Sequence, residues 1–128
     1  MIYLDSSVAL AHLLTEDKRP PETLWDQPLV SSRLLRYEIW SRLHVRGLGA
    51  SDGDRARGLI GLVWLVELSP RVLERALAPF PVSVRTLDGL HLATVEFLRN
   101  RGQTVELASY DKRLLAAARA LNVPICEL

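Results

Sequence analysis

The sequence predicts an α/β fold in three layers, with a mainly parallel sheet of about five strands between two layers of helices. Short apolar runs of strand length alternate along the chain with longer segments that have helical periodicity. Gly, Pro and small polar residues separate these segments, as expected for turns. Strands that alternate with helices are typical of a parallel sheet whose two faces are both covered.

Five short apolar runs are expected to form the strands. The first run opens the chain, and the second follows Pro28. The fifth run contains Pro124, which has no backbone N–H, so we expect this strand at an edge of the sheet. The predicted strands cover residues 2–4, 29–31, 64–68, 104–108 and 123–126.

Capping residues mark where the helices are expected to begin. Ser6 or Ser7 can cap the first helix, which is predicted to reach residue 14. Ser69 caps a helix that starts at Pro70, since proline suits the first turn. Thr86 is expected to cap a helix over residues 86–100, and a last helix is predicted over residues 111–121.

A longer helix is predicted after the second strand. Leu35, Ile39 and Leu43 are spaced four residues apart and therefore share one helical face. A further helix over residues 54–63 is expected to fold back against it. The glycines expected to break the chain between these two helices are Gly47, Gly49 and Gly53.

Length and composition predict one globular domain over residues 1–128. The chain is 48% hydrophobic and 24% charged, which excludes a disordered polar chain. The formal net charge is only +1, so any attraction for nucleic acid must come from a local group of Arg and Lys. Cys126 is the only cysteine, which excludes an intramolecular disulfide and a cysteine-rich zinc site.

No segment is typical of a secreted or membrane-spanning protein. The N-terminus lacks the basic start and apolar stretch of a secretion signal. The longest apolar run, residues 59–66, is far shorter than the roughly 20 residues that cross a bilayer. We therefore expect a cytoplasmic protein without a membrane partner.

Four acidic residues are expected at one edge of the sheet. Parallel α/β sheets bind ligands at the carboxyl ends of their strands, where the strand order reverses. Asp5 ends the first strand and Asp111 follows the fourth, so their carboxylates meet if these strands are neighbours. Glu38 and Asp88 lie near the beginnings of helices that start on the same side of the sheet.

Carboxylates that lie close together are expected to hold a hard divalent cation. They repel one another unless a cation lies among them, and Mg²⁺ or Mn²⁺ prefers oxygen ligands. Such an ion activates a water and neutralises charge on a phosphate. Three of the acids alone also have a structural explanation, whereas Asp5 has no obvious one beyond capping the helix that follows it. Asp88 and Asp111 suit helix N-termini, and Glu38 can pair with Arg42 four residues later.

At these acids the sequence resembles the PIN-domain ribonucleases, especially the VapC-type toxins of toxin–antitoxin pairs. The resemblance covers essentially the whole chain, with the segments in the family's order. Gly89 stands where alanine is usual in the family, which removes no ligand. The segments that carry the resemblance are Ile2-Tyr3-Leu4-Asp5-Ser6-Ser7, Arg36-Tyr37-Glu38-Ile39, Leu87-Asp88-Gly89-Leu90-His91-Leu92-Ala93-Thr94 and Ser109-Tyr110-Asp111-Lys112-Arg113-Leu114.

The resemblance implies a metal-dependent endoribonuclease with a PIN-like fold. It implies that RNA is the substrate, that a VapB-type antitoxin plugs the site, and that the toxin forms a homodimer. By analogy, Ser6 and Ser109 support the metal ligands or contact the phosphate. The residues that would bind Mg²⁺ or Mn²⁺ and position the water are Asp5, Glu38, Asp88 and Asp111.

Basic and aromatic residues supply further candidates. His91, one turn after Asp88, is interpreted as a packed or surface histidine, and a position at the edge of the site is the alternative. The candidate RNA contacts are Lys112 and Arg113, together with Arg33, Arg36 and Arg85. The candidate groove for an antitoxin helix or a second copy is formed by Tyr37, Trp40 and Leu43.

Two other functions were compared with the nuclease. A phosphatase with Asp5 as nucleophile would need a second aspartate two residues later, where Ser7 stands. A PIN-like module that binds RNA or protein without cutting is the remaining alternative. The complete set of four acids argues against it, because a pure binding module does not need them.

Overall fold

A four-stranded parallel sheet forms the centre of the computed structural model, which describes all 128 residues. The strand order is β3-β2-β1-β4, and all three pairings are parallel. The strands are β1 (Ile2–Leu4), β2 (Leu29–Ser32), β3 (Val63–Val66) and β4 (Glu106–Ala108). The predicted α/β class with a parallel sheet is confirmed.

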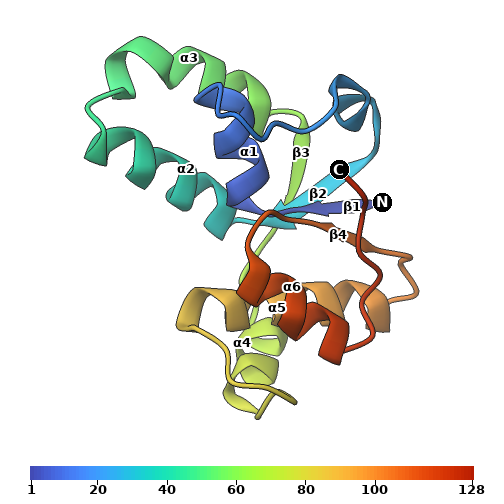
Figure 1. The fold of residues 1–128 in the computed structure, drawn as a ribbon. Helices are drawn as coiled ribbons and strands as arrows, with labels where there is room; N and C mark the ends of the chain where they lie inside the picture. The colour runs from blue at the N-terminus through green and yellow to red at the C-terminus, as the bar shows by residue number, and fades with distance from the viewer.

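Helices cover both faces of this sheet (Figure 1). On one face lie α1 (Ser6–Leu13), α2 (Leu34–Val45) and α3 (Gly49–Ile60). On the other face lie α4 (Pro70–Leu77), α5 (Thr86–Asn100) and α6 (Lys112–Ala120). A short 3₁₀ helix, η1 (Glu22–Asp26), precedes β2. None of the helices combines the length and apolar composition that a membrane span requires.

The alternation of side chains along β1 divides the core into two clusters. Leu4 packs in a cluster with Ile39 of α2, whereas Tyr3 packs in a second cluster with Leu92 of α5. Successive strand residues point to opposite faces, so the two clusters lie on opposite sides of the sheet. Tyr3 is therefore on the same side of the sheet as α5, a placement that matters for the site below.

The strand order reverses between β1 and β4. From β1 the chain passes to β2 and then β3 on one side, and β4 pairs with the other side of β1. The backbone N–H of Asp5 donates to the carbonyl of Ala108 at 3.0 Å, so the carboxyl ends of β1 and β4 lie together. The condition under which the carboxylates of Asp5 and Asp111 were expected to meet, that β1 and β4 are neighbours, is therefore fulfilled.

The predicted fifth strand over residues 123–126 is wrong. Only one isolated parallel bridge forms there, between Leu107 and Ile125. The Leu107 N–H donates to the carbonyl of Pro124, and the Cys126 N–H donates to the carbonyl of Leu107. Pro124 has no N–H to donate, so the pairing does not extend into a ladder.

Two of the predicted helix caps are also wrong. Asp5, not Ser6 or Ser7, is the N-cap of α1 and accepts from the Ser7 N–H. Thr86 is the first residue of α5, and the N-cap position is Arg85, which makes no side-chain capping bond. The Ser69 cap is confirmed, since its hydroxyl accepts from the N–H of Val72.

The helix predicted over residues 54–63 begins earlier than expected, at Gly49, and ends at Ile60. Of the three glycines expected to interrupt the chain, only Gly47 has a positive φ, of 69°, and it follows the end of α2. Gly53 lies inside α3, at a point where the ring of Trp40 leaves little room for a side chain. A Cβ at this position would be only 3.0 Å from Trp40 Cη2. Close packing of α2 against α3 thus explains a glycine that looks like a helix breaker.

Candidate active site

One cleft at the carboxyl end of the sheet brings the four predicted acids together. Its volume is about 410 Å³. The acids reach it from four separate segments: the end of β1, the first half of α2, the first turn of α5 and the residue before α6. The residues that line it are Asp5, Ser6, Ser7, Leu10, Glu38, Arg42, Arg85, Thr86, Leu87, Asp88 and Asp111.

Asp5 is the most deeply placed of the acids, with 5% of its surface exposed. Its Oδ2 accepts hydrogen bonds from Ser7 Oγ at 2.6 Å and from Ser109 Oγ at 2.8 Å. These hydroxyls compensate for the loss of water around a buried carboxylate. Asp5 is thereby held by the first turn of α1 and by the residue that follows β4.

Ser109 joins Asp5 to the segment that holds Asp111. Its hydroxyl oxygen accepts from the backbone N–H of Asp111 at 2.9 Å while it donates to Asp5. Ser7 acts in the same way, because its oxygen accepts from the N–H of Tyr110 at 2.9 Å. Ser7 was not among the predicted support residues. A hydroxyl two residues after a strand-ending acid was the available signal.

Arg85 lies between Asp88 and Asp111 and binds both. Its Nε donates to Asp88 Oδ2 at 2.8 Å, and its Nη2 donates to Asp111 Oδ2. These hydrogen bonds raise the pKa of Arg85. Burial raises the pKa of Asp111, but the Arg85 guanidinium and the amides of Leu114 and Arg113 outweigh burial and hold that pKa below its ordinary value.

Glu38 is held by His91, which reaches it from the opposite face of the sheet. His91 Nε2 lies 2.6 Å from Glu38 Oε1, and Ser6 Oγ lies 3.4 Å from Glu38 Oε2. The alternative structural pairing of Glu38 with Arg42 does not form, and Arg42 instead lines the cleft. His91 is packed, as predicted, and its contact with Glu38 also places it beside the site, which was the alternative interpretation. The contact itself was not predicted. The position of His91 one turn after Asp88 was the available signal.

Two ribonucleases of Mycobacterium tuberculosis align with almost the whole chain. Ribonuclease VapC46 of strain ATCC 25618 / H37Rv is 34% identical over 127 residues, which cover 97% of this chain and 95% of the relative. The chain belongs to the VapC family of ribonucleases. Ribonuclease VapC47 of strain CDC 1551 / Oshkosh is 26% identical over 129 residues, which cover 95% of this chain and 93% of the relative. No protein-family model matches the sequence.

The resemblance to VapC-type proteins that four sequence segments indicated is confirmed by these relatives. They establish an RNA-hydrolysing enzyme class for the family to which this chain belongs. Each of those four segments contains one of the four acids. The fold brings all four acids to one cleft.

The donor atoms of this VapC ribonuclease are suited to a hard cation. All four acids offer carboxylate oxygens, the ligands that Mg²⁺ and Mn²⁺ prefer. In this structure no three His, Cys, Asp or Glu side chains lie close enough together to hold one metal ion. Each of the four carboxylates accepts a hydrogen bond from a protein donor. Those donors are Ser7 and Ser109 for Asp5, His91 for Glu38, and Arg85 for both Asp88 and Asp111.

The predicted RNA contacts differ in their relation to the cleft. Lys112 and Arg113 are exposed at the start of α6, and Arg113 lines a neighbouring hollow together with Arg85 and Asp88. Arg33 forms an ion pair with Glu67. Two arginines line the acidic cleft itself: Arg85, which was predicted as an RNA contact, and Arg42, which was not.

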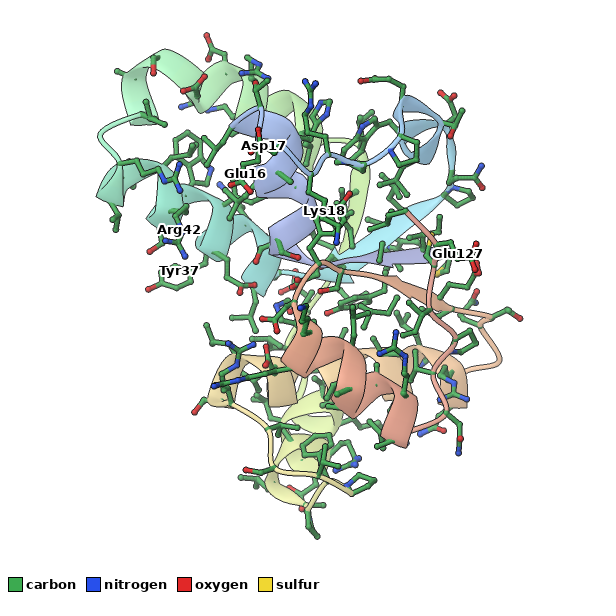
Figure 2. All side chains as sticks on the ribbon, in the orientation of Figure 1. Glu16, Asp17, Lys18, Tyr37, Arg42 and Glu127 are labelled. Carbon is green, nitrogen blue, oxygen red and sulfur yellow. The ribbon has the colours of Figure 1, made fainter.

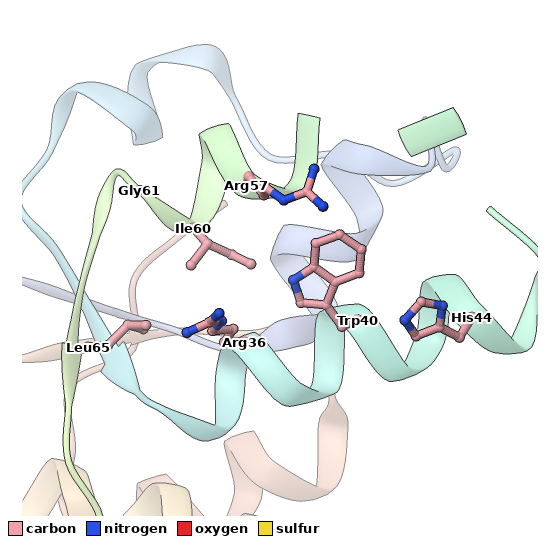
Figure 3. Close-up of a pocket in the computed structure, with 7 residues that line it drawn as sticks. All are labelled: Arg36, Trp40, His44, Arg57, Ile60, Gly61 and Leu65. Carbon is pink, nitrogen blue, oxygen red and sulfur yellow. The ribbon is translucent and has the colours of Figure 1, made fainter. Parts of the chain in front are cut away.

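A second hollow of about 670 Å³ lies between α2 and α3 and contains no acid (Figure 3). Trp40 lines it with the Arg57 guanidinium 5.0 Å from the centre of its ring, next to Arg36 and His44. Leu43 was expected at a docking groove here, but it is fully buried in the core. Tyr37 is 65% exposed, and Figure 2 shows it with Arg42 at the outer surface of α2.

Proposed function

We propose that this protein is the toxin of a toxin–antitoxin pair and cuts RNA as a divalent-metal-dependent endoribonuclease. We further propose that residues 1–128 act as one PIN-like domain in the cytoplasm, where cellular RNA is available. The observation that carries the proposal is the convergence of four carboxylates from four distant segments on one cleft. Membership of the VapC family supports the same activity.

Asp5, Glu38, Asp88 and Asp111 are the residues that would hold Mg²⁺ or Mn²⁺. When bound, such an ion activates a water for attack on the phosphodiester and neutralises the charge that develops on the phosphate. Asp5 is the most buried of these ligands, and two serine hydroxyls hold its carboxylate, so we expect it to be the most rigid of the four. Rigid ligands favour catalysis because little reorganisation is needed during the reaction.

The cleft also contains cationic groups for the RNA backbone. Arg42 and Arg85 line it, and Lys112 and Arg113 lie on the exposed start of α6 nearby. Guanidinium groups bind phosphate oxygens through charge-assisted, often bidentate, hydrogen bonds. We assign to Arg85 a contact with a phosphate at the cleavage site, and to Lys112 and Arg113 contacts with flanking phosphates. Ser6 and Ser109 support Glu38 and Asp5.

The test is cleavage of total cellular RNA by purified, antitoxin-free protein with Mn²⁺, with Mg²⁺ and with EDTA. Asp5→Asn should abolish the cleavage, whereas Asp54→Asn should leave it unchanged, because the Asp54 side chain is fully exposed on α3. Discrete fragments that require metal and Asp5 would establish the activity, and sequencing their ends would identify the substrate. Metal-independent fragments, or fragments that persist in Asp5→Asn, would refute it.

The second candidate function is a PIN-like module that binds RNA or protein without cutting. One observation favours it: Arg85 already neutralises Asp88 and Asp111. Such a module would retain RNA in a filter-binding or gel-shift assay at every metal concentration and release no fragments. Under the nuclease proposal, the same assay shows RNA loss as Mn²⁺ is added.

The proposed partners are a VapB-type antitoxin and a second copy of this chain. For the antitoxin we assign the hollow between α2 and α3, because it opens beside Trp40 on the helix that also holds Glu38. Trp40→Ala should weaken co-purification of the antitoxin encoded beside the protein and leave RNA cleavage intact. Unchanged antitoxin affinity would refute this assignment. Light scattering of the purified protein tests the homodimer.

A further inference from the structure

We propose that His91 is a positioning residue that holds the Glu38 carboxylate in its place in the cleft. The inference rests on the proposed function, in which Glu38 is a metal ligand. Three hydrogen bonds carry it, in a chain that runs from the backbone of Ser32 through Tyr3 and His91 to Glu38.

The contact between His91 and Glu38 has a defined direction. A carboxylate oxygen can only accept, so the proton lies on His91 Nε2, which is 2.6 Å from Glu38 Oε1. His91 is 1% exposed, so water does not compete for this nitrogen. A hydrogen bond to a charged group in such a site is stronger than an exposed one.

The other ring nitrogen is fixed by the sheet. His91 Nδ1 lies 2.8 Å from the Tyr3 hydroxyl, whose oxygen accepts from the Ser32 N–H at 3.1 Å. Tyr3 is completely buried, and burial raises the pKa of its hydroxyl, so the phenol stays protonated. The two rings meet edge to face at an angle of 82°, which prevents the imidazole from rotating freely.

This chain of contacts links the two layers of helices around the carboxyl end of the sheet. Glu38 belongs to α2 on one face and His91 belongs to α5 on the other (Figure 1). Asp88 lies three residues before His91 on α5, so one helix carries a candidate ligand and also the residue that orients another. Partners that orient metal ligands typically change metal affinity or activity by about 10–100-fold when they are removed.

The test compares His91→Leu, which removes the donor, with His91→Gln, whose amide keeps an N–H within reach of Glu38. Tyr3→Phe removes the hydroxyl that holds the ring, and Val95→Ala is a control for loss of core packing on α5. Mn²⁺ binding is measured by titration calorimetry, RNA cleavage gives kcat and KM, and thermal unfolding shows that each variant is folded. We expect His91→Leu to weaken Mn²⁺ binding and lower kcat by about 10–100-fold, with KM nearly unchanged.

His91→Gln should recover most of the Mn²⁺ affinity, and Tyr3→Phe should show a smaller loss than His91→Leu. Val95→Ala should lower stability without changing the Mn²⁺ affinity of the folded protein. A folded His91→Leu protein with wild-type Mn²⁺ affinity would overturn the inference, as would a His91→Gln protein as defective as His91→Leu.

Failure of the proposed function is distinguishable from failure of this inference. Wild-type protein that binds Mn²⁺ but cuts no RNA would refute the nuclease, and the Mn²⁺ titrations would still decide the role of His91. If wild-type protein does not bind Mn²⁺ either, the NMR resonance of the His91 imidazole N–H tests whether His91 contacts Glu38. A resonance that shifts in Glu38→Gln supports the contact, and one that is absent or unchanged overturns it.

Discussion

Ser109 donates a hydrogen bond of 2.8 Å to the carboxylate of Asp5, although 104 residues separate them in the sequence. The contact exists because β4 pairs with β1 on the side opposite β2, which brings the ends of these two strands together. Ser109 also accepts from the N–H of Asp111, so one hydroxyl sets the relative position of two acids of the cleft.

Ser109→Ala is therefore expected to lower both stability and activity. The substitution removes a donor from the buried Asp5 and leaves the Asp111 N–H without its acceptor, which costs about 1–3 kcal/mol. Urea unfolding measures the loss of stability, and RNA cleavage measures the effect on the site. The control is Ser51→Ala on the exposed surface of α3, for which a change within about 0.5 kcal/mol is expected. Equal stability of the two variants would contradict the prediction.

Arg85→Ala should strengthen metal binding and weaken RNA cleavage. The guanidinium competes with a cation for Asp88 and Asp111, and a partly exposed ion pair is worth up to about 1 kcal/mol, or roughly fivefold in affinity. Cleavage should fall because the cleft loses a phosphate-binding group. Calorimetry with Mn²⁺ and a cleavage assay measure the two effects. The control is Arg119→Ala, at an exposed position of α6. Mn²⁺ affinity equal to that of the wild type would show that Arg85 does not compete.

Acid should destabilise the metal-free protein partly through Asp111. The native pKa of this carboxyl lies below its ordinary value of 3.8, so the unfolded chain binds a proton more readily than the folded one. The stabilisation is complete above that ordinary pKa and is lost as the pH falls through the native pKa. Unfolding free energies measured in EDTA from neutral to acidic pH should decrease less steeply in Asp111→Asn than in wild type. Identical slopes would contradict the prediction.

Two glycines of α3 should respond in opposite ways to alanine. Gly58→Ala should stabilise the protein by about 0.5–1 kcal/mol, because a Cβ there meets no atom within 4 Å and alanine favours the helix. Gly53→Ala should give no such gain, since its Cβ would lie 3.0 Å from the Trp40 ring. Urea unfolding of both variants measures the difference, and an equal gain would mean that the Trp40 ring moves without cost.

Local sequence was enough to predict the fold class and to name the acids. The apolar runs, the helical spacing of Leu35, Ile39 and Leu43 and the turn residues all act within a few positions along the chain. Asp5 could be placed because it ends a strand, and parallel strands present their carboxyl ends at one edge. The role of the four acids in metal binding and catalysis stays a prediction until the variants are measured.

Two of the wrong predictions have different physical causes. Pro124 permits one bridge to Leu107 but no strand, because the ladder lacks its N–H. Gly53 was expected to break the helix, but it lies within α3, where the Trp40 ring packs close to its backbone. At Gly53 a local preference is outweighed by contact with another helix, whereas at Pro124 the missing N–H of the residue itself limits the pairing.

For Glu38 and Asp111, only the tertiary structure decided which side chain binds the carboxylate. His91 reaches Glu38 from a segment 53 residues away, and Arg85 reaches Asp111 across 26 residues. No periodicity links these positions, because a hydrogen bond depends on distances of about 3 Å between side chains that only packing of the whole chain brings together. Periodicity along the chain therefore predicted which edge of the sheet holds the acids, whereas packing between layers determined how each acid is held there.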